Sequence, residues 1–307
     1  MRDKLLLPLL TISAGVILIF SSGCNTDKSV SSEEANLQID SLIANPDIFN
    51  EISDAKKIFY ALPSPIETAI ILKSAGAKYN EDLMNPTQNV ENYTTNQAMA
   101  LNLGIYTTDL SFASLFDQTQ ASINYMEAAR EMANGLGILD AINNNTMMML
   151  EENINNRDVI MDIISETFMS TSAFLKENDR EALSAVVLVG GWVEGLFIST
   201  QLIQEEVNLE ENKLAVRTME QKLSLDIVKR LLELYQEHPD VAPLIVLIDD
   251  LSRTFDKVEI KSTPVNVEMS EGDQPANLKS VNEVTFSPQT FLELKEKVKT
   301  IRSNFIL

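Results

Sequence analysis

Apolar residues recur every three or four positions along most of this chain, a spacing that places them on one face of an α-helix. The pattern is clear in three segments, residues 96–116, 119–136 and 209–236, and none of them has the strict alternation of a β-strand. In the first segment the apolar face consists of Met99, Leu103, Tyr106, Leu110 and Ala113. The pattern therefore predicts an all-α fold.

The same spacing, together with helix-start signals, divides the chain into helices with short connections. We expect helices at residues 33–44, 47–61, 65–77, 96–116, 119–136, 138–152, 156–176, 179–203, 209–236, 239–255 and 288–305. One start signal is Ser287-Pro288, a capping serine followed by a proline at the first helical position. Because short connections make consecutive helices antiparallel neighbours, the expected architecture is an antiparallel helical bundle or a stack of helical hairpins.

The segment at residues 257–286 breaks this pattern. It contains two prolines, one glycine and short alternations of valine and isoleucine. These features predict a short irregular or β-like segment, either a small hairpin or an ordered loop. Together with the last helix, we assign it to a single helical domain spanning residues 35–307.

The most apolar stretch of that domain runs from Ala185 to Ile198. Its 14 residues are too few to cross a bilayer, which takes about 20, and they include Glu194. We therefore expect the central buried helix of the bundle, where Gly191 and Gly195 would let a neighbouring backbone approach closely. Core filling is also expected of three consecutive methionines, Met147 to Met149.

Glu194 is a candidate binding residue because a buried carboxylate must be paired or have a raised pKa. One interpretation is a buried hydrogen-bonding group, or a helix end that touches solvent. The other is the carboxylate of a ligand pocket beside Trp192. Tyr106 and Asp109 are further ligand-binding candidates, since they place an aromatic and an acidic group within another apolar run.

Composition limits the classes of partner. Hydrophobic residues make up 45% of the chain, which is typical of a globular protein. The chain has 24 Lys+Arg against 45 Asp+Glu, a net charge of −21. Such a charge repels phosphate backbones and anionic lipid, so we expect no nucleic-acid partner. Solubility is the simplest reason for the acidity, and a basic partner or scattered divalent cations are the alternatives.

No arrangement of residues in the sequence predicts catalysis. The chain has one cysteine, Cys24, and one histidine, His238, which excludes a zinc site built from these two residue types. A Ser-His-Asp triad would need His238, but no G-x-S-x-G nucleophile elbow is present. Ser53 and Lys56 have the S-x-x-K spacing of penicillin-binding enzymes without their S-D-N and K-T-G elements. We expect no catalytic residue, no cofactor and no metal.

The first 24 residues predict export. Residues 2–4 are charged, residues 5–20 form an uncharged apolar run, and Ser21-Ser22-Gly23 is a small-residue exit, as in a secretory signal. Followed by Cys24, these residues resemble the lipobox of bacterial lipoproteins, although Ser21 stands where a leucine is usual. The resemblance implies diacylglycerol on the Cys24 sulfur, removal of residues 1–23 as a signal peptide, and acylation of the new amino terminus.

Residues 24–34 are polar and serine-rich, and we interpret them as a lipidated tether. Asn25 is not the aspartate associated with inner-membrane retention, so the analogy favours the outer membrane of a Gram-negative bacterium. The expected partners are the membrane, bound through Cys24, and another envelope protein. We expect a lipid-anchored cell-envelope protein with a binding or scaffolding role. The alternative is a capture lipoprotein that holds a nutrient or a cell-wall fragment in an interhelical pocket.

Overall fold

The fold is built mostly from α-helices, as the hydrophobic spacing predicts. The computed structural model describes residues 73–74, 76–139, 144–153, 156–178, 180–203, 208–262, 266–268, 277–279 and 282–307. The α-helices of this part are α5 (Asn96–Leu115), α6 (Thr119–Gly135), α7 (Asn144–Glu152), α8 (Arg157–Glu177), α9 (Glu181–Gln201), α10 (Lys213–Glu220), α11 (Lys222–Leu234), α12 (Ala242–Phe255) and α13 (Pro288–Phe305). Two short 3₁₀ helices, η1 (Glu81–Leu83) and η2 (Thr87–Asn92), precede them. The helices predicted at 33–44 and 47–61, and most of that at 65–77, lie outside the described residues.

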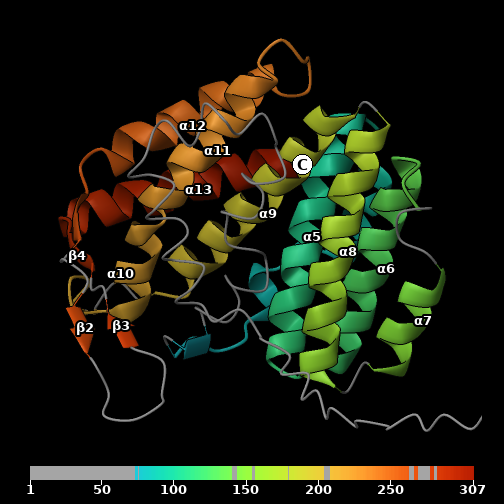
Figure 1. The fold of residues 1–307 in the computed structure, drawn as a ribbon, viewed down its shortest axis with the longest axis horizontal. Coiled ribbons are helices and arrows are strands. Elements are labelled where there is room, and N and C mark those ends of the chain that lie inside the picture. Colours follow the sequence, from blue (N-terminus) through green and yellow to red (C-terminus); the bar gives the residue numbers. More distant parts are fainter. Residues whose placement is uncertain are drawn as a thin grey trace, which may run out of the picture. The chain divides into compact units, whose positions relative to one another are not determined.

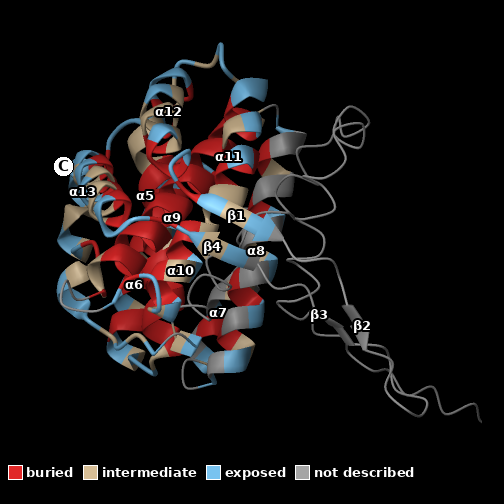
Figure 2. Cartoon of the chain, turned by 90° about the vertical axis from the view of Figure 1, so that its left-hand side faces the viewer, coloured by how far each residue is buried: buried red, intermediate tan, exposed pale blue. Residues whose placement is uncertain are grey.

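Helices α5 and α9 pack against each other at the centre of the described unit (Figure 1). Helix α5 also contacts α6 and α8, while α9 also contacts α10, α11 and α13. Fifteen of the 20 residues of α5 are buried, so a single apolar face is too narrow a description of this helix (Figure 2). In α9, 19 of 21 residues are buried, which confirms that the stretch from Ala185 to Ile198 forms a central buried helix.

Among the described helices, α9 is the one long and apolar enough to cross a membrane by length and composition. However, 94% of its most apolar window is buried by the rest of the protein. A helix that is apolar on all sides is expected in the core of a protein as well as in a membrane. The burial accounts for the composition of α9 without a bilayer.

The two central helices meet backbone to backbone at glycines. A Cβ atom on Gly104 of α5 would overlap the carbonyl oxygen of Val187 and lie 2.6 Å from the backbone nitrogen of Gly191. A Cβ atom on Gly190 would likewise overlap the carbonyl oxygen of Leu101. Glycine removes this obstacle because it has no Cβ. The close approach expected at Gly191 is confirmed, and Gly104 is its partner on α5.

Helices α10 to α13 lie on another side of α9 (Figure 1). Helix α13 packs against both α9 and α12. It begins at the predicted residue, since the Ser287 side chain accepts a hydrogen bond of 3.1 Å from the Thr290 N–H, and Pro288 occupies the first helical position. Its buried hydrophobic residues are Phe291, Leu294, Val298, Ile301 and Phe305.

The segment at 257–286 contains the β-strands, as its composition predicts. Strand β1 (Glu259–Ser262) pairs antiparallel with β4 (Asn282–Thr285), and β2 (Asn266–Glu268) pairs antiparallel with β3 (Asn277–Lys279). Each pair is a two-stranded sheet. The register of the first pair sets Glu259, Ile260, Lys261 and Ser262 opposite Thr285, Val284, Glu283 and Asn282.

The single helix predicted at 209–236 is wrong, because α10 ends and α11 begins around Gln221. Thr218 and Leu225 are both buried on the core side. An uninterrupted helix would direct Gln221 or Lys222 into the core between them, since residues three and four apart share a face. The break keeps both polar side chains half-buried, and Lys222 donates a hydrogen bond of 2.6 Å to the Val258 carbonyl.

The segment predicted as a helix from residue 138 also differs. Ile138 and Leu139 are not helical, and the described helix α7 begins at Asn144. Met148 and Met149 have 56% and 39% of their surface exposed, so the prediction that the methionines fill the core is wrong for these two. The reason is that α7 lies at the outside of the helices and contacts α8, while its far side faces solvent (Figure 1).

Candidate functional site

A buried ion pair joins the central helix α9 to the last helix α13. Arg302 donates two hydrogen bonds to Glu194, from Nε to Oε2 at 3.0 Å and from Nη2 to Oε1 at 3.1 Å. Glu194 is fully buried and Arg302 is 6% exposed. Burial raises the pKa of Glu194, and the positive charge of Arg302 opposes that shift. Both carboxylate oxygens of Glu194 are therefore engaged by a side chain of the same protein.

The rest of the Arg302 guanidinium is also held. Its Nη2 donates a second hydrogen bond, of 3.1 Å, to the carbonyl oxygen of Leu83 at the end of η1. Its central carbon lies 4.5 Å from the centre of the Phe197 ring, a cation–π contact. Arg302 thus connects α9, α13 and the segment before α5.

Asp109 of α5 is also fully buried, and it lies close enough to Glu194 for the two carboxyl groups to interact electrostatically. Its Oδ2 accepts a hydrogen bond of 3.0 Å from the backbone N–H of Asn85, whereas its Oδ1 has no donor. Burial, and then the negative charge of Glu194, raise the pKa of Asp109 well above its ordinary value, while Arg302 and the Asn85 N–H oppose the shift. We assign a proton to Asp109, because its pKa is raised and a protonated Oδ1 needs no hydrogen-bond donor, which none of the described residues supplies.

With this proton, the charges of the two carboxyl groups and the guanidinium are balanced. One proton and one Arg302 charge offset two carboxyl groups that are both removed from water. Without that proton, two negative charges would share one positive charge inside the protein. The cluster therefore contains buried carboxyl groups that release their protons at a higher pH than exposed carboxyl groups do.

Amide and phenol side chains extend this cluster toward the carboxyl terminus. Asn85 Nδ2 donates to both the Tyr93 hydroxyl and Asn102 Oδ1, each at 3.0 Å. Asn102 Nδ2 donates to the Phe305 carbonyl at 2.8 Å, and the Tyr93 hydroxyl donates to the Ile306 carbonyl at 3.3 Å. The end of α13 is therefore tied to α5 and to the segment before it. We call Asn85, Tyr93, Asn102, Asp109, Glu194 and Arg302 the polar network.

The structure brings together two of the four ligand-binding candidates, Glu194 and Asp109. Tyr106 lies one turn before Asp109 and is fully buried, and its hydroxyl donates to the Pro86 carbonyl at 3.0 Å. Burial raises the pKa of Tyr106. Trp192 is 8% exposed, and its Nε1 donates no hydrogen bond to Glu194 or to any other described residue. Of the two interpretations of Glu194, the hydrogen bonds favour the buried, paired group.

Sequence reasoning missed Arg302, which is the partner that decides the state of Glu194. A signal for it was present in the last helix. Val298 and Phe305 lie on the buried face, and Arg302 follows Val298 by four residues, so it occupies a position that the helical spacing assigns to the core. A single basic residue on an apolar helix face predicts a buried acidic partner.

The remaining candidates for chemistry give no further site. His238 is partly exposed, and its Nδ1 accepts a hydrogen bond of 3.2 Å from the Asp240 N–H within a turn. In the described part of the chain, no three His, Cys, Asp or Glu side chains come together in a way that could hold a metal ion. Ser53, Lys56 and Cys24 lie outside the described residues.

Comparison of the chain with protein-family models, with curated proteins and with solved structures finds no match. The assignment of a function therefore depends on the sequence and on the geometry of the described residues.

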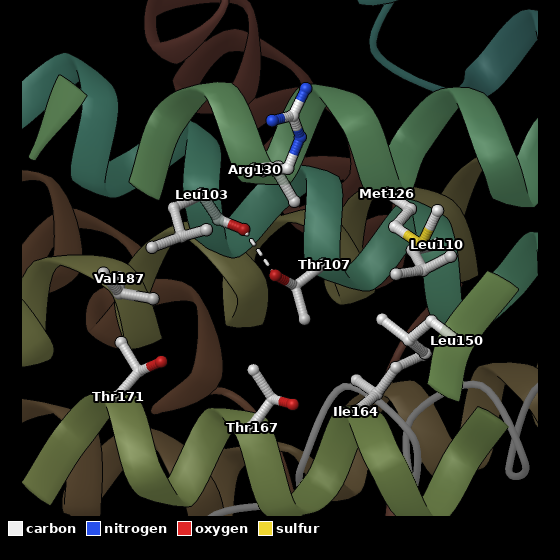
Figure 3. A pocket seen from close by; sticks show the side chains of 11 residues that line it. Leu103, Thr107, Leu110, Met126, Arg130, Leu150, Ile164, Thr167, Thr171 and Val187 are labelled. Atoms are coloured by element: carbon white, nitrogen blue, oxygen red, sulfur yellow. Dashed lines mark hydrogen bonds between the residues drawn. The ribbon is translucent and has the colours of Figure 1, made fainter. Parts of the chain in front are cut away.

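A separate hollow lies among helices α5 to α9, each of which contributes at least one lining residue (Figure 3). Its volume is about 60 Å³. The residues that line it are Leu103, Thr107, Leu110, Met126, Ala129, Arg130, Leu150, Ile164, Thr167, Thr171 and Val187. None of the binding candidates predicted from the sequence belongs to this set. We call it the apolar hollow.

Proposed function

We propose that this protein is a lipid-anchored component of the bacterial cell envelope with a binding or scaffolding role. The observation that carries the proposal is the position of Cys24, the one cysteine of the chain, directly after Ser21-Ser22-Gly23 and an uncharged apolar run. Asn25 after the lipidated cysteine favours the outer membrane. The attachment would be stable, because two or more acyl chains hold a protein at a membrane where one does not.

Two places in the described core, the polar network and the apolar hollow, favour a scaffolding role over capture of a nutrient at either of them. In the polar network, both carboxylate oxygens of Glu194 accept hydrogen bonds from Arg302, so they are not available to a ligand. The apolar hollow, at about 60 Å³, is far smaller than the roughly 300–1,000 Å³ of pockets that enclose a typical small-molecule ligand. A protein whose buried groups satisfy one another is suited to present a stable outer surface to a partner.

The first test is metabolic labelling of cells with a clickable palmitate analogue. The wild-type protein should take up the label, and Cys24→Ser should not. Ser29→Ala, a change within the tether that keeps the cysteine, is the matched control and should label like the wild type. Equal labelling of wild type and Cys24→Ser, or release of both as soluble protein, would show that the anchor is wrong.

The second test concerns the membrane. We expect the labelled protein to fractionate with the outer membrane on a density gradient, and Asn25→Asp to move it toward the inner membrane. Cross-linking in intact cells should then capture a second envelope protein. Stabilisation of the purified protein by cell-wall fragments or a nutrient, with no protein captured, would instead support the capture alternative.

A further inference from the structure

The apolar hollow has walls that offer almost no hydrogen bonding. Thr107, Thr167 and Thr171 carry hydroxyl groups. Thr107 Oγ1 donates to the Leu103 carbonyl at 2.7 Å (Figure 3), and Thr167 Oγ1 donates to the Ile163 carbonyl at the same distance. The hydroxyl hydrogens of Thr107 and Thr167 are thus used within their own helices. A buried water needs two to four polar partners, and these walls do not supply them. The hollow is therefore a site for apolar atoms.

The hollow is also small. On α5 the lining runs from Leu103 to Leu110, and on α8 it runs from Thr171 back to Ile164. Its volume of about 60 Å³ is well below the roughly 150 Å³ of an engineered cavity that binds benzene. A space of this volume suits the end of a linear chain and is too small for a ring.

The surroundings of the hollow include exposed apolar and basic groups. Leu150 of α7 lines it, and the two residues before Leu150, Met148 and Met149, are exposed. Arg130 contributes to the lining, while Figure 3 shows its guanidinium directed away from the hollow. Arg130 pairs with Glu127 at 2.6 Å, and both side chains are 44% exposed, so this pair contributes little stability and leaves the guanidinium accessible to an anionic group.

We propose that the apolar hollow binds the end of one linear hydrocarbon chain, as in the terminal carbons of an acyl group. The hydrocarbon could come from a lipid of the surrounding membrane or from the protein's own acyl groups at Cys24, and the chemistry of the site is the same for both. The proposal rests on the walls and volume of the hollow, so it does not depend on lipidation of Cys24.

The experiment uses the full chain in phosphatidylcholine vesicles with a palmitic acid analogue that carries a photoreactive diazirine on its last carbon. After illumination, mass spectrometry should find the label on peptides of α5 and α8 that line the hollow. Ala129→Leu places extra carbons in the space and should reduce this labelling about tenfold, which corresponds to the loss of about two buried methylene groups. Absence of label from these peptides in the unsubstituted protein would overturn the proposal.

Two matched variants separate blocking from damage. Asn124→Leu adds the same side chain at an exposed position of α6 and should label like the unsubstituted protein. Thr167→Val keeps the shape of the wall and removes a hydroxyl, so labelling should be retained. If Ala129→Leu labels as strongly as Asn124→Leu, the label does not enter the hollow and the proposal is wrong.

A competition on the unsubstituted protein keeps the test independent of folding. Unlabelled palmitic acid should displace the probe, whereas an analogue that ends in a phenyl ring should not. Equal displacement by both would overturn the proposal, because the probe would then occupy a space large enough for a ring, and the hollow is too small for one. The source of the chain follows from Cys24→Ser. Stronger labelling of this variant than of the wild type identifies the protein's own lipid as the natural occupant, and unchanged labelling identifies membrane lipid.

Discussion

Two sides of helix α5 meet the rest of the protein in opposite ways. Asn102 and Asp109 belong to the polar network, in which nearly every buried polar atom has a partner. Leu103, Thr107 and Leu110 line the apolar hollow. Because each residue of a helix is rotated by about 100° from the one before, stripes offset by one residue face different neighbours.

The difference shows which defects a protein core can tolerate. An empty apolar space of about 60 Å³ costs only about 1–2 kcal/mol in lost contacts. A buried charge without a partner costs about 3–5 kcal/mol. The hollow can therefore remain unfilled, whereas the polar network must be complete. We expect substitutions to follow the same ranking.

The largest effect is expected from Arg302→Met. The change leaves Glu194 and Asp109 buried without a positive charge and should lower the free energy of unfolding by about 3–5 kcal/mol, measured by urea denaturation. Lys299→Met, on the exposed side of the same helix, should change it by less than about 0.5 kcal/mol. The double variant Arg302→Met with Glu194→Gln should recover part of the loss. If Arg302→Met is as stable as Lys299→Met, the ion pair does not stabilise the protein.

The next largest effect is expected at Gly104, where the backbones of α5 and α9 are in close contact. Gly104→Ala places a Cβ against the Val187 carbonyl and should lower the free energy of unfolding by about 1–3 kcal/mol. At Gly135 the added Cβ meets only the end of the flexible Met99 side chain, so Gly135→Ala should be tolerated. Chemical denaturation of the two variants tests this contrast. Similar losses in both would mean that the α5–α9 contact is not close.

A third prediction concerns pH. Burial raises the pKa of Asp109 above its ordinary value of 3.8, so the native protein holds a proton there that the unfolded chain releases. The stability contributed by this proton is complete below about pH 4 and is lost as the pH rises toward the raised pKa. Asp109→Asn imitates the protonated side chain and should avoid this loss.

Stability curves in urea from pH 4 upward provide the measurement. The wild type and Asp109→Asn should be close at pH 4, and the variant should gain on the wild type with a slope of up to about 1.4 kcal/mol per pH unit. Glu194 also has a raised pKa, so some pH dependence of the same sign should remain in the variant. Asp226→Asn, at an exposed position of α11, should run parallel to the wild type. Parallel curves for Asp109→Asn would show that Asp109 is not protonated.

The smallest effect is expected on the apolar side. Ala129→Leu fills part of the hollow and should raise the free energy of unfolding by about 0.5–1 kcal/mol in the absence of lipid. The melting temperature of this variant, compared with that of Asn124→Leu, measures the gain. A clear loss of stability in Ala129→Leu alone would indicate that the hollow is smaller than the structure describes.

Much of the fold could be predicted because helical spacing is a local property. The predicted segments 119–136, 156–176 and 288–305 match α6, α8 and α13 within about two residues. The break at Gln221 could not be predicted in this way, because it depends on the burial of Thr218 and Leu225 in the core, which is set by tertiary packing. Met149 was misplaced for a related reason, since its exposure depends on which neighbours cover α7.

The candidate site was only half predictable. Glu194 and Asp109 were identified because acidic groups stand out in apolar runs, while their common position followed from the packing of α5 on α9. Arg302 is 108 residues from Glu194 in the chain, and no local spacing connects the two. The hollow is likewise a property of packing, since its walls are ordinary leucine, isoleucine and threonine side chains.

By itself the sequence determined the helical class, the buried character of the stretch from Ala185 to Ile198 and the absence of internal disulfide pairing, since one cysteine cannot pair within the chain. The tertiary structure alone decided that Glu194 meets Arg302, that Asp109 shares its site, and that a hollow remains beside α5. The local spacing of hydrophobic residues indicates which side chains are buried. Which buried groups meet depends on how distant helices cross, and that is set by packing of the whole core.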